Sequence, residues 1–384
     1  MALLVGTSFL TSCIKDEAKN KECDILNAWV QGEELASCFS DQNQMRKSDI
    51  SSIEKEITFT VRSLLSLPKQ IPVYFDVTPG ATVEPASGSL QDFTAGPVTY
   101  TVTSEDGEWR RQYKVAFAEP VLPSFMFSFE HVEVSDETLT GCRYHMFYEK
   151  TDDGEQDAFI WASGNSGASL TMTNGQPADF PTSSVDDGYQ GKGVCLKTIS
   201  TGALGEWMGK PIAAGNLFLG NFLFENVLID PLKCTQFGIP VDRIPVRVTG
   251  YYKYKRGEKF TDQDMKEVPG RTDEASIYAV VYRNKDAEGN ELFLYGDDVK
   301  DLDNIVEDNP YVVKVAQVKQ LPAADEWTRF EMFFEGVDVD DQEVADGAYS
   351  LALVFSSSKG GADFEGAIGS TLYIDEVELS FEEK

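Results

Sequence analysis

Histidine and the common catalytic motifs are scarce in this sequence. Of its 384 residues only two are histidines, His131 and His145. No GxSxG elbow, HExxH pair, Walker loop or dinucleotide-binding fingerprint occurs. The sequence therefore offers too few histidines to favour a Ser-His-Asp triad or a histidine-rich metal site. The six cysteines form no CxxC pair, which argues against a zinc site built on thiolates.

Positive charge is also in short supply. The sequence has 33 Lys and Arg residues against 64 Asp and Glu residues, which gives a formal net charge of −31. Such a chain repels the phosphates of nucleic acids, so we predict no nucleic-acid partner. With so many acids, no single carboxylate pair indicates glycoside hydrolysis, which needs two carboxylates about 5–9.5 Å apart across a cleft.

The apolar N-terminal run, residues 1–9, is too short for a membrane-spanning helix and is typical of a signal peptide. Residues 10–13 (LTSC) resemble a bacterial lipobox, which predicts lipidation of Cys13. No Lys or Arg precedes Cys13, so we expect the translation start to lie further upstream. Residues 14–17 (IKDE) resemble the surface-display tag of Bacteroidetes lipoproteins. We therefore predict a lipid anchor in the outer membrane and exposure at the cell surface, with residues 1–22 as signal and tether.

Residues 23–119 are predicted to form a small β-sandwich. Segments of alternating apolar and polar residues are typical of half-buried strands, and turns rich in Gly and Pro separate them. These segments are residues 57–61, 71–77, 98–103 and 111–117. The stretch VTPGATVEPASGSLQDFTAGPVTYTVTSEDGEWRRQYKV resembles the immunoglobulin-like spacer domains of Bacteroidetes lipoproteins. Cys23 and Cys38 could pair here, since export permits disulfides.

Residues 124–384 show no sustained helical period, and the stiff segment EPVLP separates them from the first domain. Strand candidates are residues 125–129, 193–198, 245–254, 276–283, 327–334, 349–356 and 370–381. Short strands with long loops over this length predict one large sandwich or jelly roll. The predicted fold class is therefore all-β, with a small immunoglobulin-like β-sandwich followed by a larger jelly-roll β-sandwich.

Four segments of the larger domain carry a family resemblance. They are WASGNSG at 161–167, AAGNLFLGNF at 213–222, GYYKYKRG at 250–257 and VFSSSKGGADFEGAIGSTLYIDEVEL at 354–379. In order and spacing they resemble the putative carbohydrate metabolism domain of Bacteroidetes surface lipoproteins. The resemblance implies a jelly roll similar to carbohydrate-binding modules, and it brings no established reaction. Some members carry a glycoside-hydrolase label, for which no residue here gives support.

Aromatic and amide side chains are the candidates for sugar recognition. Sugar rings pack on aromatic faces, and their hydroxyl groups need directional hydrogen-bond partners. Trp161 and Asn165 offer both within one loop. Trp207 lies among glycines that would let a ligand approach the backbone. We predict all three as ligand contacts; an ordinary core or lid position is the alternative for each tryptophan.

Alternation along residues 246–255 places Tyr251 and Lys253 on the more polar face of a strand. We predict that both contact a ligand in a groove, with a plain solvated face as the alternative.

The long loop SSSKGGADFEG carries Asp363 and Phe364 at its tip. Function tends to lie on such loops, so we predict both as ligand contacts. A flexible hairpin loop is the alternative.

A structural calcium ion often joins the first and last strands of carbohydrate-binding jelly rolls. Glu130 and Asp375 lie near the two ends of the domain and supply the hard oxygen ligands that calcium requires. We predict this pair as metal ligands, with two solvated acids as the alternative. No cofactor is required otherwise.

The predicted function is non-catalytic binding of a polysaccharide or oligosaccharide, in polysaccharide capture. The alternatives are a glycoside hydrolase that uses a carboxylate pair, and a structural or adhesive surface protein with an exposed apolar patch or open sheet edge. Sugar binding requires that loop aromatics and amides meet in one hollow, so the deciding observation is which of Trp161, Trp207, Tyr251 and Phe364 share a concave surface.

Overall fold

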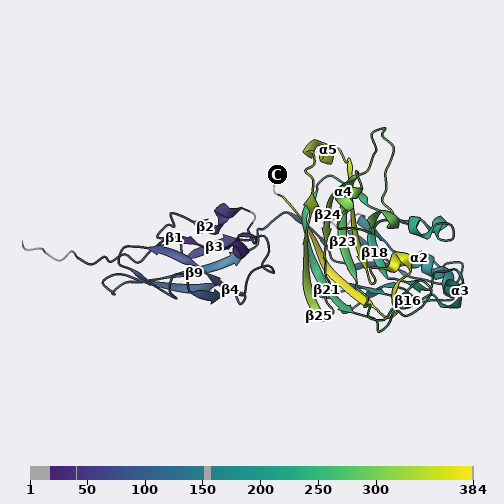
Figure 1. The fold of residues 1–384 in the computed structure, drawn as a ribbon, viewed down its shortest axis with the longest axis horizontal. Helices are drawn as coiled ribbons and strands as arrows, with labels where there is room; N and C mark the ends of the chain where they lie inside the picture. The colour runs from purple at the N-terminus through teal and green to yellow at the C-terminus, as the bar shows by residue number, and fades with distance from the viewer. Residues whose placement is uncertain (1–17, 40, 151–156, 383–384) are drawn as a thin grey trace, which may run out of the picture. The chain divides into compact units, whose positions relative to one another are not determined.

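The computed structural model describes residues 18–39, 41–150 and 157–382, the last range without the side chains of residues 157–160. The chain divides into two compact units, Met1–Val121 and Leu122–Lys384. Strands dominate both units (Figure 1), so the all-β prediction is confirmed. The described α-helices are short, α3 (Gly202–Trp207) being six residues long. None of the helices in these ranges has the length and apolar character needed to cross a bilayer.

The N-terminal unit is a small β-sandwich. Its described sheets have the strand orders β2-β1-β5 and β3-β9-β8-β6, and β4 pairs with β7. The elements are β1 (Ile25–Trp29), α1 (Glu33–Ala36), η1 (Gln42–Met45), β2 (Arg46–Lys47), β3 (Glu56–Thr60), β4 (Gln70–Pro72), β5 (Tyr74–Val77), β6 (Thr82–Glu84), β7 (Leu90–Asp92), β8 (Val98–Thr103) and β9 (Arg110–Ala118).

Inward-facing side chains of these strands form one apolar core, which includes Phe59, Tyr100 and Tyr113. Cys23 and Cys38 are both buried free thiols, so the disulfide that the sequence allowed is not formed. The narrower assignment of this sandwich as immunoglobulin-like stays a prediction.

The C-terminal unit contains two large sheets. The six-stranded sheet has the order β14-β15-β29-β21-β25, with β10 paired to β29. Its strands are β10 (Ser124–Phe127), β14 (Thr182–Val185), β15 (Gly193–Lys197), β21 (Pro245–Lys255), β25 (Ala324–Phe333) and β29 (Thr371–Phe381). All of these pairings are antiparallel, as in a jelly-roll sandwich.

The ten-stranded sheet has the order β11-β12-β13-β18-β27-β23-β24-β26, with β19 paired to β18 and β20 paired to β27. Its strands are β11 (His131–Val134), β12 (His145–Lys150), β13 (Asp157–Ala162), β18 (Asn216–Phe222), β19 (Thr235–Phe237), β20 (Ile239–Val241), β23 (Ser276–Arg283), β24 (Val312–Gln317), β26 (Glu335–Gly336) and β27 (Tyr349–Ser356).

Short elements connect the two sheets and cover their edges. They are α2 (Asn165–Ala168), η2 (Ser169–Thr171), η3 (Pro177–Asp179), β16 (Ile199–Ser200), β17 (Ile212–Ala213), η4 (Phe224–Asn226), η5 (Pro231–Lys233), β22 (Phe260–Thr261), η6 (Gly296–Val299), α4 (Ile305–Asp308), α5 (Asp341–Ala345), η7 (Gly361–Asp363) and β28 (Gly366–Ala367). In Figure 1, α2, α3 and β16 lie on the side of β18 that faces away from β21 and β25.

The ten-stranded sheet is apolar on both faces, and this property positions the site. Along β23, Ile277, Ala279 and Val281 point into the core between the two sheets. Tyr278 and Val280, which alternate with them, join a separate apolar cluster on the outer face. A sheet covered on both faces is built from continuous apolar runs, and YAVVY in β23 and LALVF in β27 are such runs.

Candidate functional site

A pocket with a volume of about 300 Å³ lies over the outer face of the ten-stranded sheet. Phe218 of β18, Tyr278 of β23 and Val354 of β27 line it from the sheet. Residues from α2, α3, the η5 region, η6 and the loop after β27 complete the lining. A concave site of this kind, formed by loops on a rigid sheet, is the usual form of a small-molecule binding site.

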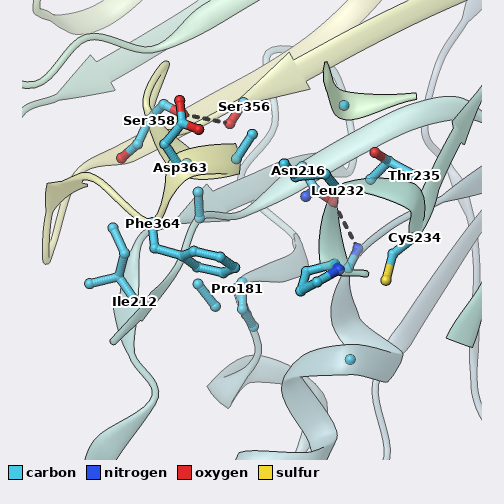
Figure 2. A pocket seen from close by; sticks show the side chains of 18 of the residues that line it. Pro181, Ile212, Asn216, Leu232, Cys234, Thr235, Ser356, Ser358, Asp363 and Phe364 are labelled. Carbon is cyan, nitrogen blue, oxygen red and sulfur yellow. Dashed lines mark hydrogen bonds between the residues drawn. The ribbon is translucent and has the colours of Figure 1, made fainter. Parts of the chain in front are cut away.

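Phe364 is the aromatic side chain that the loop after β27 brings to the pocket. Figure 2 shows its ring extending into the pocket beside Pro181. Its backbone is left-handed, with φ of 58°. That conformation costs a non-glycine residue about 1–2 kcal/mol, so the surrounding loop has to hold it in place.

Asp273 anchors this loop. Its buried carboxylate Oδ2 accepts hydrogen bonds from Ser358 Oγ (2.6 Å), Ala367 N (2.8 Å) and Ser370 Oγ (2.7 Å). Its Oδ1 accepts from Glu274 N (2.9 Å). One carboxylate thus ties together both ends of the segment that carries Phe364, and these bonds satisfy the buried charge.

Asn216 provides an amide at the pocket wall. Its Oδ1 accepts a hydrogen bond from Gly164 N (2.8 Å), one of the two bonds drawn in Figure 2. Its backbone N donates to Thr182 Oγ1 (3.2 Å), and Thr182 Oγ1 donates to its carbonyl oxygen (2.7 Å). No bond from Asn216 Nδ2 is found in the described part of the chain, so this group is free to donate to a ligand.

Charge in the pocket is carried by three lysines and one carboxylate. The lysines are Lys210, Lys300 and Lys359, and the carboxylate is Asp363. Lys300 Nζ donates to Asp363 (2.7 Å) and also pairs with Asp297 (3.1 Å). The hydrogen bond with Asp363 raises the pKa of Lys300. Among the described residues that line the pocket Asp363 is the one carboxylate, and Asp297, which pairs with the same lysine, lies outside the lining.

Residues 128–380 match the profile of the family described as putative carbohydrate metabolism domain. This match covers more than half of the chain. The chain belongs to the putative carbohydrate metabolism domain family. Within the N-terminal unit, residues 38–116 match the profile described as SGBP, N-terminal.

Two solved structures resemble this putative carbohydrate metabolism domain protein. One, described as a putative glycoside hydrolase from Bacteroides thetaiotaomicron, is 35% identical, with 96% of this chain and 100% of that chain covered and a TM-score of 0.60. The other, a putative glycoside hydrolase from Bacteroides vulgatus, is 36% identical, with 67% of this chain and 98% of that chain covered and a TM-score of 0.59. A search of curated proteins found no match.

Trp161 is a core residue of the putative carbohydrate metabolism domain, so its prediction as a ligand contact is wrong. It lies on β13 and is 4% exposed. Its ring packs against Phe127 and Phe129 in the core between the sheets, with ring centroids 4.9 and 5.4 Å away. Burial of this large ring removes a large apolar area from water, which stabilises the core.

Asn165 does not line the pocket, but it holds Thr182, which lies beside the pocket residue Asn216. Its fully buried amide donates to Thr182 O (2.7 Å) and accepts from Thr182 N (3.1 Å). Both polar atoms of the amide are therefore used inside the protein. Thr182 in turn holds the backbone of Asn216, so Asn165 is a positioning residue and its predicted ligand contact is wrong.

Trp207 ends α3 and is 85% exposed. It does not line the pocket, although Gly205 and Met208 beside it in the chain do. Its predicted contact with a ligand stays a prediction for a ligand that extends beyond the pocket.

Tyr251 and Lys253 lie on the outer face of the six-stranded sheet. The predicted alternation along β21 is confirmed, because Tyr252 and Tyr254 point into the core instead. Tyr251 stacks on Tyr189, with ring centroids 3.7 Å apart.

The Lys253 ammonium lies over the Trp327 ring at 4.6 Å and over the Tyr373 ring at 5.1 Å. These contacts form an aromatic surface of their own, on the other side of the sandwich core from the pocket. Of Trp161, Trp207, Tyr251 and Phe364, only Phe364 lines the pocket, so the four residues do not share one hollow.

Glu130 and Asp375 converge on one loop, as their predicted pairing requires. Glu130 Oε1 accepts from Lys192 N (2.8 Å), and Asp375 Oδ2 accepts from Gln190 N (2.9 Å). Burial raises the pKa of Asp375 to about 6.

Both acids are thus engaged in holding the loop, and the described ranges contain no group of three His, Cys, Asp or Glu side chains that could hold a metal. The pair alone does not make a calcium site. Calcium binding stays a prediction, and an unchanged melting temperature in EDTA would count against it.

Cys13, the predicted lipidation site, lies outside the described residues. The site residues that sequence reasoning missed are Asn216 and the sheet residues Phe218, Tyr278 and Val354. Asn216 and Phe218 lie in the segment AAGNLFLGNF, which carried the family resemblance. The continuous apolar runs in β23 and β27 were the available signal for Tyr278 and Val354, because they indicate a sheet covered on both faces.

Proposed function

We propose that this protein binds a carbohydrate in the pocket over the ten-stranded sheet and does not cleave it. Phe364 carries the proposal, because its ring extends into the pocket from a loop held by Asp273. An aromatic face packs against the C–H groups of a sugar ring, and Asn216 Nδ2 and the Lys300–Asp363 pair are available to its hydroxyl groups. Membership of the putative carbohydrate metabolism domain family supports the same ligand class.

Non-catalytic binding is favoured over hydrolysis by the charge of the lining. The two solved relatives are described as putative glycoside hydrolases, which makes hydrolysis the second candidate function. Hydrolysis by a carboxylate pair needs a second acid that faces the ligand. In the described lining Asp363 is the one carboxylate, because Asp297, which shares Lys300 with it, does not line the pocket. Release of reducing sugar that disappears in Asp363→Asn would overturn the non-catalytic proposal.

The test of binding is a glycan array followed by titration calorimetry with the best glycan. We expect Phe364→Ala to weaken binding about 5-fold, since loss of an aromatic contact is worth about 1 kcal/mol. Phe293→Ala is the matched control, because Phe293 is exposed and lies outside the pocket lining. Equal affinities of the wild-type protein and Phe364→Ala would contradict this site.

The cellular setting belongs to the same proposal. The lipobox-like LTSC and the IKDE segment after it support a lipid anchor at Cys13 and display on the outer membrane. A tethered binder at that surface would capture polysaccharide from the medium.

A further inference from the structure

The pocket is more apolar than binding of a bare sugar requires. Side chains without a polar atom make up most of its inner surface. They include Phe218, Phe222, Phe237, Val299, Leu302 and Val354. A sugar hydroxyl pressed against such groups loses its water partners and gains none, which costs about 1–3 kcal/mol. The part of the ligand that reaches these residues should therefore carry no hydroxyl groups.

Tyr278 is the polar exception among these residues. Its side chain lines the pocket and the residue is only 7% exposed. Other buried tyrosines of this unit donate to backbone carbonyls, as Tyr282 does to Phe237 O (2.6 Å). The hydroxyl of Tyr278 makes no hydrogen bond within the described ranges, although its backbone pairs with both neighbouring strands. This hydroxyl is therefore available to pair with a ligand that enters the pocket.

The hydroxyl of Tyr278 acts as a donor at physiological pH. Burial raises the pKa of Tyr278, so the proton stays on the oxygen. A donor beside apolar side chains suits a ligand atom that accepts a hydrogen bond and is flanked by carbon. The carbonyl oxygen of an ester has these properties, whereas a hydroxyl group or an amide brings a further donor that would stay unpaired.

We propose that the carbohydrate bound here carries an ester-linked acyl group, which lies on the apolar side chains while Tyr278 donates to the ester carbonyl. The inference rests on the proposed sugar-binding function of the same pocket. Phe364 and Asn216 then contact the sugar ring, and the sheet residues contact the acyl chain.

The test uses titration calorimetry on the full chain and compares three forms of each of three sugars. They are methyl glycosides of glucose, galactose and mannose, their 6-O-butanoyl esters, and the 6-O-butyl ethers that match the esters in length. We expect an ester to bind at least about 10-fold more tightly than its parent glycoside, because each buried methylene adds about 0.8 kcal/mol. We also expect the ester to bind more tightly than the ether.

Two variants assign this preference to the pocket. Tyr278→Phe should remove the preference for ester over ether and leave both ligands bound. Leu232→Trp should reduce binding of the esters, since Leu232 lines the pocket. Leu228→Trp in the same segment is the control, because Leu228 is 68% exposed and does not line the pocket.

The outcomes separate this inference from the proposed function. Methyl glycosides that bind as tightly as the esters, or esters that do not bind, would overturn the acyl inference. If an ester preference survives in Tyr278→Phe, the assigned role of Tyr278 is wrong. If ethyl butanoate without any sugar binds as tightly as the sugar esters, the proposed carbohydrate function itself fails.

Discussion

His145 illustrates how one backbone contact sets the chemistry of a side chain. It is partly buried on β12, and Ser184 N donates to its Nδ1 (3.0 Å). This bond requires a neutral imidazole with an unprotonated Nδ1. Burial lowers the pKa of His145 below its usual value of 6.5, Asp186 opposes the shift and Lys192 adds to it.

We predict that an NMR titration of the imidazole C–H signals gives His145 a pKa below 6.5. The chain has only two histidines, so the spectrum of His131→Gln assigns the signal. As the pH falls below 6.5 the unfolded chain binds the proton first. The contribution of His145 to the free energy of unfolding is therefore complete above that pH and declines as the pH falls towards the folded pKa. A pKa at or above 6.5 would contradict the buried geometry.

Hydrogen bonds between loops distant in sequence hold the segment that carries Phe364. The segment from Ser357 to Ser370 connects β27 to β29, and Asp273 from an earlier loop holds it at three points. Thr198 adds bonds to Ser357 Oγ (2.8 Å) and Ser358 Oγ (2.5 Å). The position of Phe364 thus depends on residues that are far from it in the sequence.

We predict that Asp273→Ala lowers the free energy of unfolding by about 3 kcal/mol, because it leaves buried donors without an acceptor. Binding of glycan should weaken as well, since Phe364 loses its support. Urea denaturation measures the first effect, and hydrogen exchange at the Ala367 amide reports the loosened loop.

Asp262→Ala is the control, because Asp262 is only partly buried and accepts from Asp264 N and Lys266 N in a local turn. A stability loss in Asp273→Ala no larger than in this control would remove Asp273 from its role as anchor.

Strand positions were largely predictable at this scale. The predicted segments 98–103, 276–283 and 349–356 coincide with β8, β23 and β27. Periodicity marked them because apolar and β-branched residues recur between Gly and Asp turns. Trp161 was predicted to lie in a loop, but it lies on β13. The local sequence does not decide between the two, because a tryptophan before ASGNSG is compatible with a loop and with the end of a strand.

For the molecule as a whole, we predict that Cys13→Ser moves the protein from the membrane fraction to the soluble fraction. A thioether-linked lipid needs the thiol, and a serine cannot replace it. The protein is expressed with its N-terminal segment in a host that lipidates exported proteins, and the fractions are compared by immunoblot. Cys195→Ser should leave the distribution unchanged, because Cys195 lies on β15 of the larger domain. Retention of Cys13→Ser in the membrane fraction would refute the lipid anchor.

Composition and periodicity by themselves determined that this chain is acidic, all-β and built of two domains. Those properties follow from local patterns, because alternation and turn residues act within a few positions of one another. The motifs WASGNSG and SSSKGGADFEG also marked segments that contribute to the pocket.

Only the tertiary structure decided which side chains meet a ligand. Alternation separates the two faces of a strand but does not say which face another layer covers. Trp161 and Tyr278 are both aromatic residues on strands of one sheet, yet the first fills the core and the second lines the pocket. That difference arises from loops distant in sequence, which cover the outer face of the sheet and leave a space above Tyr278.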